Sequence, residues 1–440
     1  MGMWSQARAM AAQTPEERNR YVDFLRAVSI LFVIVGHWLI TTAEYDPTSG
    51  VITPVLALEI VPWTAWLSWL FQVMPIFFIV GGYSNAISLA GAERKGLSYA
   101  QWLTGRLHRL LTPLTALVLF WAGLSLALTA LGASSETVVF LSRTALVPTW
   151  FLAIYTMIVL LAPATHAFWR RYGFASLGVY IALAIAVDGA YFLLDMKAPG
   201  WTNYFWVWLA MHHLGFVWQE GRLPRTVWLL ILSAAALAVL YYLTVIGPYP
   251  IAMAGSPGEE VSNTLPPKIT LITLGLAQFG LLMALENPMR KALGSLRLWT
   301  ATVLVNSMIM SIYLWHMTVL LALFAASYYL GGVGLTLEPG SSEWWLARPA
   351  WLLVPGILLV PVALLASPLE RLARGADAPV PAAWRLVLGA VMTGAGITMA
   401  TLLGFNGTLF SVASTGAILL LAGGAWICGI LPISRSRAGA

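Results

Sequence analysis

Apolar runs of about 20 residues recur along the whole chain, separated by short connections that hold most of the charge. A helix needs about 20 mainly apolar residues to cross a bilayer, and inside the hydrocarbon only helices and closed barrels satisfy their backbone hydrogen bonds. The sequence therefore predicts an all-α, polytopic membrane helix bundle. Twelve spans are expected, at roughly 22–42, 63–90, 110–131, 149–168, 174–194, 201–219, 226–245, 268–286, 300–328, 349–369, 385–405 and 408–430.

Composition supports a membrane protein and excludes several other classes. Hydrophobic residues make up 59% of the chain and charged residues only 10%, whereas soluble domains carry about 25% charged residues. The net charge of +6 lies in the connections, so we interpret it as a topology signal and expect no nucleic-acid partner. A single cysteine, Cys428, excludes an internal disulfide and a cysteine-clustered metal site. We predict no metal.

Nearly all Lys and Arg residues fall in alternate connections, on the side that holds the N-terminus. The other side keeps only Arg143, Lys197, Lys268 and Arg348. Because basic connections stay inside, we expect a multi-pass protein of the cytoplasmic membrane with both termini cytoplasmic. The predicted organisation is a cytoplasmic tail (1–19), a transmembrane core (20–372), and a further transmembrane hairpin with a short cytoplasmic tail (373–440).

Three ionisable residues share one face of the first span. At about 100° per residue, Asp23, Arg26 and His37 fall within about 60° of one another, with His37 about 16 Å beyond Arg26. Such groups are costly in a membrane and face a bundle interior or an aqueous cavity. His37 is either a buried histidine bonded to a neighbouring helix or a neutral general base. Asp23 and Arg26, three residues apart, suit a structural ion pair.

Two arginines, Arg106 and Arg109, stand three residues apart just before the third predicted span. On a helix this spacing lets both guanidinium groups reach one anion at the cytoplasmic surface. Arginine suits phosphate because its planar fork donates paired hydrogen bonds. The alternative is an ordinary pair of positive-inside anchors.

Polar residues also interrupt two later apolar runs. The run at 63–90 contains the adjacent glycines Gly81 and Gly82, which permit either close helix contact or a locally opened helix. In the run at 300–328, Asn306 and Tyr313 stand one heptad apart and are expected to share a face of the helix. The pair His212-His213 lacks a carboxylate or further histidine at helical spacing, so it does not predict a metal site. The candidate cavity-lining residues are Tyr83, Ser84, Asn306, Tyr313 and His316, with packing as the alternative.

Together and in this order, these pieces resemble the acyltransferase-3 family of integral membrane acyltransferases, over roughly residues 18–370. Each piece is short, and their order along the chain carries the resemblance. The matching segments are Arg20-Tyr-Val-Asp23-Phe-Leu-Arg26-Ala with His37, Phe77-Phe78-Ile-Val-Gly81-Gly82-Tyr83, Arg106-Leu-His-Arg109 with Pro113, Trp150-Phe151-Leu152 with Pro163, and Ile312-Tyr313-Leu314-Trp315-His316.

The resemblance implies a ten-helix core over residues 20–372 that moves an acyl group from cytoplasmic acyl-CoA to a hydroxyl of a carbohydrate or glycolipid acceptor. It implies His37 as the catalytic histidine, Arg106 and Arg109 as contacts for the donor phosphates, and Asp23 and Arg26 as supporting groups. Acyl-CoA is then a co-substrate and no other cofactor is expected. The expected partners are the lipid bilayer, acyl-CoA and the acceptor, and a separate acceptor-presenting protein is a further candidate partner.

The chain departs from the family pattern in three places. Gly81 stands where the family has a serine, and Ala153-Ile154-Tyr155 lacks the glutamate that many members place after the tryptophan of the fourth span. Two apolar spans follow the core where some members have a soluble hydrolase-like domain. We therefore expect the acceptor to be handled by the membrane domain or by a separate protein.

Two other classes of protein fit twelve spans. A transporter or lipid flippase would use Asp188 and Glu286 as intramembrane coupling groups, although transporters often show paired repeats that this sequence lacks. A membrane scaffold would use its polar residues only to hold helices together. Binding of acyl-CoA separates the enzyme from both.

Overall fold

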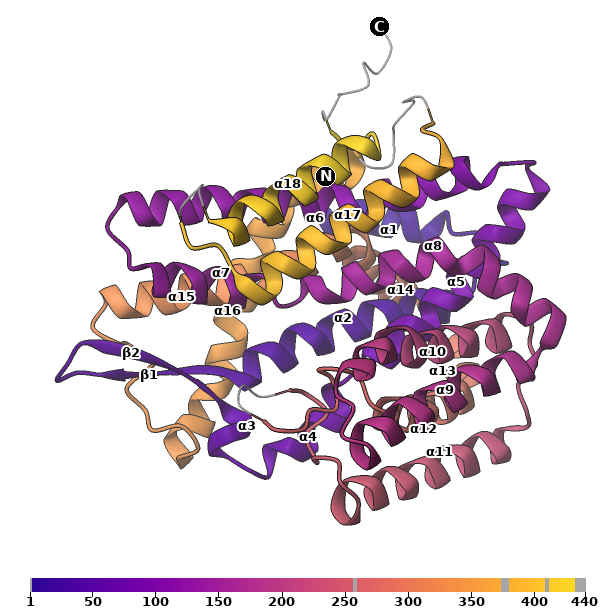
Figure 1. Cartoon of the computed structure of the whole chain (residues 1–440), viewed down its shortest axis with the longest axis horizontal. Helices are drawn as coiled ribbons and strands as arrows, with labels where there is room; N and C mark the ends of the chain where they lie inside the picture. Colours follow the sequence, from indigo (N-terminus) through magenta and orange to yellow (C-terminus); the bar gives the residue numbers. More distant parts are fainter. Residues whose placement is uncertain (1, 256–258, 373–379, 408–410, 432–440) are drawn as a thin grey trace, which may run out of the picture. The chain divides into compact units, whose positions relative to one another are not determined.

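The computed structural model describes residues 2–255, 259–372, 380–407 and 411–431 (Figure 1). Contacts divide the chain into two compact units, which are described separately. The first unit is Met1–Ser88, Ala162–Ile309 and Gly332–Arg348, and the second is Leu89–Leu161, Met310–Gly331 and Pro349–Ala440. The predicted connection at 373–379 and the predicted tail at 432–440 lie outside the described residues.

Helices make up most of the first unit, together with one β-hairpin that continues directly from α2. Strands β1 (Thr41–Asp46) and β2 (Val51–Leu56) pair antiparallel, mostly in the connection between the first two predicted spans, where no strand was expected. The helices are α1 (Met3–Ala12), α2 (Arg20–Ile40), α3 (Ala57–Ile60), α4 (Thr64–Phe71), α9 (Phe174–Leu193), α10 (Asn203–Gln219), α11 (Thr226–Tyr241), α12 (Ile269–Ala284), α13 (Glu286–Ala292) and α14 (Leu296–Ser307), with short turns η1 (Ala198–Thr202) and η2 (Tyr242–Ile246).

The second unit is helical throughout its described residues. Helices α5, α8 and α16 contribute residues to both units, as does α15 through its first residue, Ile309. The remaining helices belong to the second unit alone. The bounds are α5 (Met74–Arg94), α6 (Tyr99–Ala130), α7 (Ser135–Leu146), α8 (Thr149–Tyr172), α15 (Ile309–Tyr329), α16 (Ser342–Leu372), α17 (Ala383–Leu403) and α18 (Val412–Ile427).

The predicted membrane helix bundle is confirmed. Among the described residues, nine helices are long and apolar enough to cross a membrane, and the bent pair α12–α13 raises the number to ten. The protein is therefore a multi-pass integral membrane protein. The prediction of twelve spans is too high by this criterion, because α10 and α18 have only 17 and 16 residues and a span needs about 20.

Two predicted spans are broken helices. The span expected at 63–90 divides into α4 and α5, because Pro75 starts a new helix and the carbonyl of Gln72 accepts a hydrogen bond from Gln278. The span expected at 300–328 divides at Met308. There the side chains of Asn306 and Ser307 donate hydrogen bonds to backbone carbonyls of their own helix. Side chains that bond to the backbone in this way compete with the helical hydrogen bonds and can end or bend a helix.

Adjacent glycines in α5 serve close helix packing, the default interpretation from the sequence. A Cβ on Gly82 would lie 1.9 Å from the carbonyl oxygen of His212, and one on Gly215 would lie 2.2 Å from that of Ile79. Helices α5 and α10 therefore cross with their backbones in contact, as small residues allow in membrane bundles. Phe78 stacks on Trp208 beside this crossing, with ring centroids 4.5 Å apart.

Contacts within the first unit hold α2 at both of its ends and α4 beside it. Arg20, at the start of α2, donates to the carbonyl of Leu293 at 3.0 Å. At the other end of α2, a Cβ on Gly36 would lie 3.1 Å from Phe71. Beside α4, Trp69 donates to the carbonyl of Ile251 at 2.8 Å.

Candidate functional site

Helix α2 begins at a polar cap that the sequence analysis did not single out. The side chain of Asn19 accepts a hydrogen bond from the backbone N–H of Tyr21 at 3.1 Å, which satisfies one of the free N–H groups at a helix start. Asp23 follows in the first turn, where a negative charge is stabilised by the helix dipole. The start of this span is therefore well determined by local chemistry.

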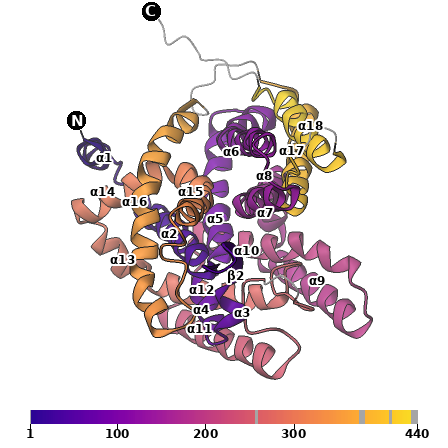
Figure 2. The same ribbon diagram turned by 90° about the vertical axis from the view of Figure 1, so that its left-hand side faces the viewer.

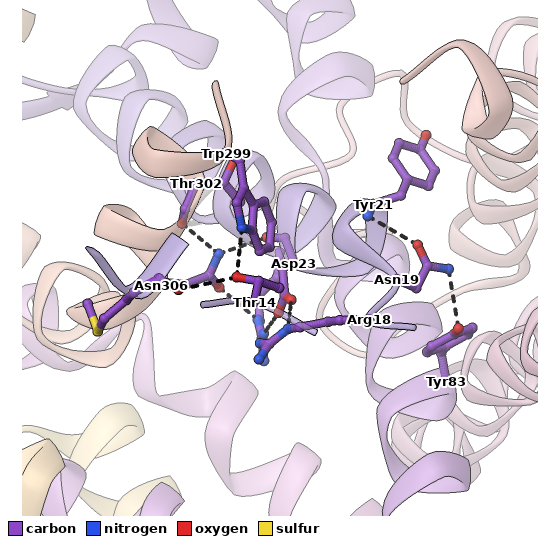
Figure 3. Close-up of polar contacts among 11 residues, drawn as sticks. Thr14, Arg18, Asn19, Tyr21, Asp23, Tyr83, Trp299, Thr302 and Asn306 are labelled. Carbon is purple, nitrogen blue, oxygen red and sulfur yellow. Dashed lines mark hydrogen bonds and ion pairs between the residues drawn. The ribbon is translucent and has the colours of Figure 1, made fainter. Parts of the chain in front are cut away.

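The carboxylate of Asp23 is the centre of an ion-pair network (Figure 3). Its side chain is only 7% exposed. Arg18 donates from Nε to Oδ2 at 2.6 Å, and Arg26 donates from Nη2 to Oδ1. The hydrogen bond to Asp23 raises the pKa of Arg18 above its ordinary value. Asp23 and Arg26 thus form the ion pair expected from their spacing, and Arg18 adds a second cation.

Asn306 connects this ion pair to α14. Its Oδ1 accepts a hydrogen bond from Nε of Arg26 at 3.0 Å, and its Nδ2 donates to the backbone carbonyl of Asp23 at 2.9 Å (Figure 3). The guanidinium of Arg26 is therefore held on two sides, by a carboxylate and by an amide. The Nε1 of Trp299 in the same helix donates to the hydroxyl of Thr14 at 2.9 Å, and this bond helps to hold α1 against α14.

A second polar junction lies at the same end of α2. Nδ2 of Asn19 donates to the hydroxyl of Tyr83 and to Oε1 of Glu286, both at 3.2 Å. Trp218 donates to Oε2 of Glu286 at 2.9 Å, and its ring lies 4.5 Å from that of Tyr83. Glu286 therefore joins α2, α10 and the bend between α12 and α13. These bonds favour a structural role for Glu286 over the coupling role of the transporter hypothesis.

Replacing Asp23 with asparagine should lower the stability of the first unit by about 1–3 kcal/mol, the usual range for hydrogen bonds to charged groups. The loss is limited because the side chains of Arg18 and Arg26 are 54% and 36% exposed, so water compensates part of the lost charge pairing. Thermal unfolding of purified protein in detergent measures the change. The exposed Glu17→Gln variant is the matched control. Equal unfolding temperatures for both variants would contradict a stabilising network.

His37 lies in the last turn of α2, three residues before the helix ends at Ile40. At about 1.5 Å per residue, it is about 16 Å beyond Arg26 and about 5 Å from the end of the helix. It is therefore past the midpoint of the span, and the structure does not bring it into contact with the Asp23 network. The side chain is partly exposed, and the neighbouring Gly36 packs on Phe71 of α4.

Arg106 and Arg109 lie within one long helix of the second unit. Helix α6 has 32 residues, about 48 Å at 1.5 Å per residue, so it exceeds a hydrocarbon core of about 30 Å. Both arginines fall within its first eleven residues. Arg106 is half-buried with its guanidinium 5.9 Å from the ring centroid of Trp102, while Arg109 is exposed. Their spacing on one helix is as expected.

The other candidate cavity-lining residues are divided between the two units. Asn306 belongs to α14 in the first unit, whereas Tyr313 and His316 belong to α15 in the second. The break at Met308 therefore contradicts the expectation that Asn306 and Tyr313 share a face of one helix. Tyr313 donates to the carbonyl of Pro148, and Nδ1 of His316 lies 2.6 Å from the carbonyl oxygen of Tyr313. Ser84 is partly exposed on α5.

The second carboxylate of the transporter hypothesis, Asp188, also has structural partners. It accepts hydrogen bonds from Asn203 at 2.9 Å, from Tyr249 at 3.0 Å and from the backbone N–H of Ile269 at 2.8 Å. The last of these places a carboxylate at the start of α12, where the helix dipole stabilises it. The nearby Lys268 is buried, and that burial lowers its pKa from the ordinary value against the opposing effect of Asp188.

The structure thus brings together Asp23, Arg26 and Asn306, and joins Tyr83 to the start of α2 through Asn19. Sequence reasoning counted Arg18 only among the many basic residues on the N-terminal side and did not single out Asn19. An asparagine directly before an apolar helical run is a recognised start signal, so Asn19 was detectable. The partners of Asn19 were not, because they come from distant segments.

A comparison with family models identifies the chain. Neither the curated proteins nor the solved structures contain a match. A family model described as an acyltransferase domain matches residues 19–369, which include Asp23, Arg26 and Asn306, His37, and Arg106 with Arg109. The match covers well over half of the 440 residues. The chain therefore belongs to the acyltransferase 3 family of membrane proteins.

Proposed function

We propose that this protein moves an acyl group from cytoplasmic acyl-CoA to a hydroxyl of a carbohydrate or glycolipid acceptor. Membership of the family implies acyltransferase activity. The observation that carries the finer proposal is the Asp23–Arg26–Asn306 network. It holds the guanidinium of Arg26 on the helix face that, eleven residues later, presents His37. Helix α2 therefore has a charged group, Arg26, near its start and an imidazole, His37, near its other end. This arrangement suits a helix that lines the binding path of a long anionic donor such as acyl-CoA.

The donor phosphates are assigned to Arg106 and Arg109. Their spacing lets two guanidinium groups engage one anion, and α6 is long enough to carry them beyond the hydrocarbon. Two further basic residues, Arg94 and Lys95, precede α6 in the same unit. A positively charged surface of this kind attracts the anionic end of acyl-CoA before it binds.

His37 is assigned as general base. Neutral imidazole takes the proton of the acceptor hydroxyl, whose oxygen attacks the thioester carbonyl. The carbon–sulfur bond then breaks, and the departing sulfur takes the proton from the imidazolium to give the free thiol of coenzyme A. The alternative is an acyl-histidine intermediate, which mass spectrometry of acid-quenched protein would reveal as a modified peptide containing His37.

The charge pattern supports a place in the cytoplasmic membrane with the basic connections and both termini on the cytoplasmic side. In that orientation the donor reaches Arg106 and Arg109 directly from the cytoplasm. The acceptor is handled by the membrane domain itself or is presented by a separate protein.

Binding of coenzyme A to purified protein tests the donor assignment. The double variant Arg106→Gln/Arg109→Gln should bind coenzyme A about ten- to a hundredfold more weakly, because each arginine contributes a charge-assisted hydrogen bond. A variant with the same charge change at two exposed positions of the first unit, Arg225→Gln/Arg297→Gln, should bind within about twofold of wild type. Unchanged binding by the first variant would refute the arginine assignment, and no binding by wild type would favour the transporter or scaffold.

A further inference from the structure

Helices α17 and α18 follow the end of the family domain at residue 369 and pack on each other and on α6 (Figure 2). Their backbones are in close contact at two glycines. A Cβ on Gly389 would lie 2.6 Å from the carbonyl oxygen of Gly424, and one on Gly424 would lie 2.5 Å from that of Gly389. Small residues at such a crossing give tight helix pairs in membranes. The hairpin of α17 and α18 is therefore one well-packed element.

One end of this hairpin is attached to the late part of α6 and to α7. A Cβ on Gly407, just beyond α17, would lie 1.6 Å from the hydroxyl oxygen of Thr129 in α6. The backbone N–H of Phe405 donates to the hydroxyl of Ser142 in α7 at 2.8 Å. The hydroxyl of Thr401 lies 2.8 Å from that of Thr149 at the start of α8. This end of the hairpin thus touches three helices of the second unit.

The other end contacts the early part of α6 through His108. Helix α18 ends at Ile427 with Cys428 as its cap. Gly429 follows with a φ of 74°, the left-handed conformation that glycine adopts after helix ends. The ring of His108 in α6 lies beside the backbone of Cys428, directly after α18. Because the N–H of Cys428 donates to Gly424 at 3.0 Å, a donor on His108 would bond to the carbonyl of Cys428. His108 is only 7% exposed.

His108 stands between the two arginines of the proposed donor site. From His108 to Thr129 is about 31 Å along α6 at 1.5 Å per residue, so the hairpin contacts both ends of this long helix. At about 100° per residue, Arg106 and Arg109 lie about 160° and 100° from His108 around the helix axis. A bond that holds His108 against α18 therefore turns both arginines away from the hairpin.

We propose that the hairpin α17–α18 positions the donor site, and that His108 sets the rotation of the segment that carries Arg106 and Arg109 by donating a hydrogen bond to the carbonyl of Cys428. This inference rests on the proposed donor role of the two arginines. His108 acts through the arginines and does not itself touch the donor, so it is a positioning residue.

Equilibrium binding of coenzyme A to the purified full-length protein tests the inference. His108→Phe keeps a ring of similar size but loses the hydrogen-bond donor, and it should weaken binding about five- to tenfold, the effect of one lost hydrogen bond. His108→Gln retains a donor and should bind within about twofold of wild type. S-acetyl-pantetheine, which lacks the nucleotide phosphates, should bind equally to wild type and His108→Phe, because only the phosphate contacts are disturbed.

Three further variants complete the experiment. Gly389→Ala, which pushes α18 away from α17, should weaken coenzyme A binding in the same direction and tests the inference if His108→Phe does not fold. Thr401→Val removes the hydroxyl contact at the other end and should leave coenzyme A binding unchanged. Arg106→Gln/Arg109→Gln tests the proposed function separately.

The outcomes distinguish the two hypotheses. If the arginine variant binds coenzyme A as wild type does, the proposed donor role fails and the inference falls with it. If the arginine variant binds weakly but His108→Phe does not, only the inference is overturned. Equal weakening of coenzyme A and S-acetyl-pantetheine by His108→Phe would also overturn it, because that result indicates general loosening of the fold.

Discussion

Replacing His37 with alanine should reduce acyl transfer by a factor of about 10²–10⁴, the usual contribution of a positioned general base. The imidazole is expected to take the proton of the acceptor hydroxyl, and alanine offers no acceptor for it. For the same reason, wild-type activity should fall as the pH is lowered, because an imidazolium cannot accept a proton. Transfer of label from acetyl-, succinyl- and longer-chain acyl-CoA into the lipid and polysaccharide fractions of isolated membranes measures the effect.

His166→Gln is the matched control for this experiment. His166 is a partly exposed histidine of the same unit, with its ring 5.1 Å from that of Phe216, and it has no assigned role in transfer. His37→Ala should still bind coenzyme A within about twofold of wild type, which separates loss of chemistry from loss of fold. Transfer within a few-fold of wild type at matched expression would exclude His37 as the base.

Replacing Gly82 with valine should cost about 3 kcal/mol or more of stability, because a new side chain at a full contact forces backbones apart. Its Cβ alone would lie 1.9 Å from the carbonyl oxygen of His212 and 3.2 Å from the Cα of Gly215. Both are main-chain atoms, so no side chain can rotate to make room. We expect a strongly reduced yield of folded protein and a lower unfolding temperature in detergent.

Gly178→Ala is the control for Gly82. Gly178 lies in α9 of the same unit, and a Cβ there meets nothing within 4 Å. Alanine should leave stability unchanged or raise it by up to about 1 kcal/mol, because glycine is the weaker helix former. If Gly82→Val is as stable as Gly178→Ala, the close crossing of α5 and α10 does not exist in the folded protein.

Much of the fold was predictable because membrane helices follow local rules. Hydropathy over about 20 residues depends only on nearby sequence, so a span was expected near every helix that passes the length and apolarity test. Errors arose where side-chain hydrogen bonds compete with the helix. Asn306 and Ser307 end α14 inside a continuous apolar run, and nothing in the hydropathy of that run marks the break.

The candidate site was predictable only in part. The ion pair of Asp23 and Arg26 follows from a spacing of three residues on one helix. The partners of that pair do not, because Asn306 lies 280 positions from Arg26 along the chain. The position of His108 beside Cys428 was also not anticipated, because the two residues lie 320 positions apart along the chain.

The sequence by itself determined that this chain is a helical membrane protein whose motifs resemble one acyltransferase family, because composition, charge alternation and short motif spacing are local properties. The tertiary structure alone decided which polar groups meet. Asn19 and Glu286 are 267 positions apart yet share a hydrogen bond, and Gly82 and Gly215 bring two backbones into contact. Such pairings depend on how helices cross, and many distant side chains together determine that geometry.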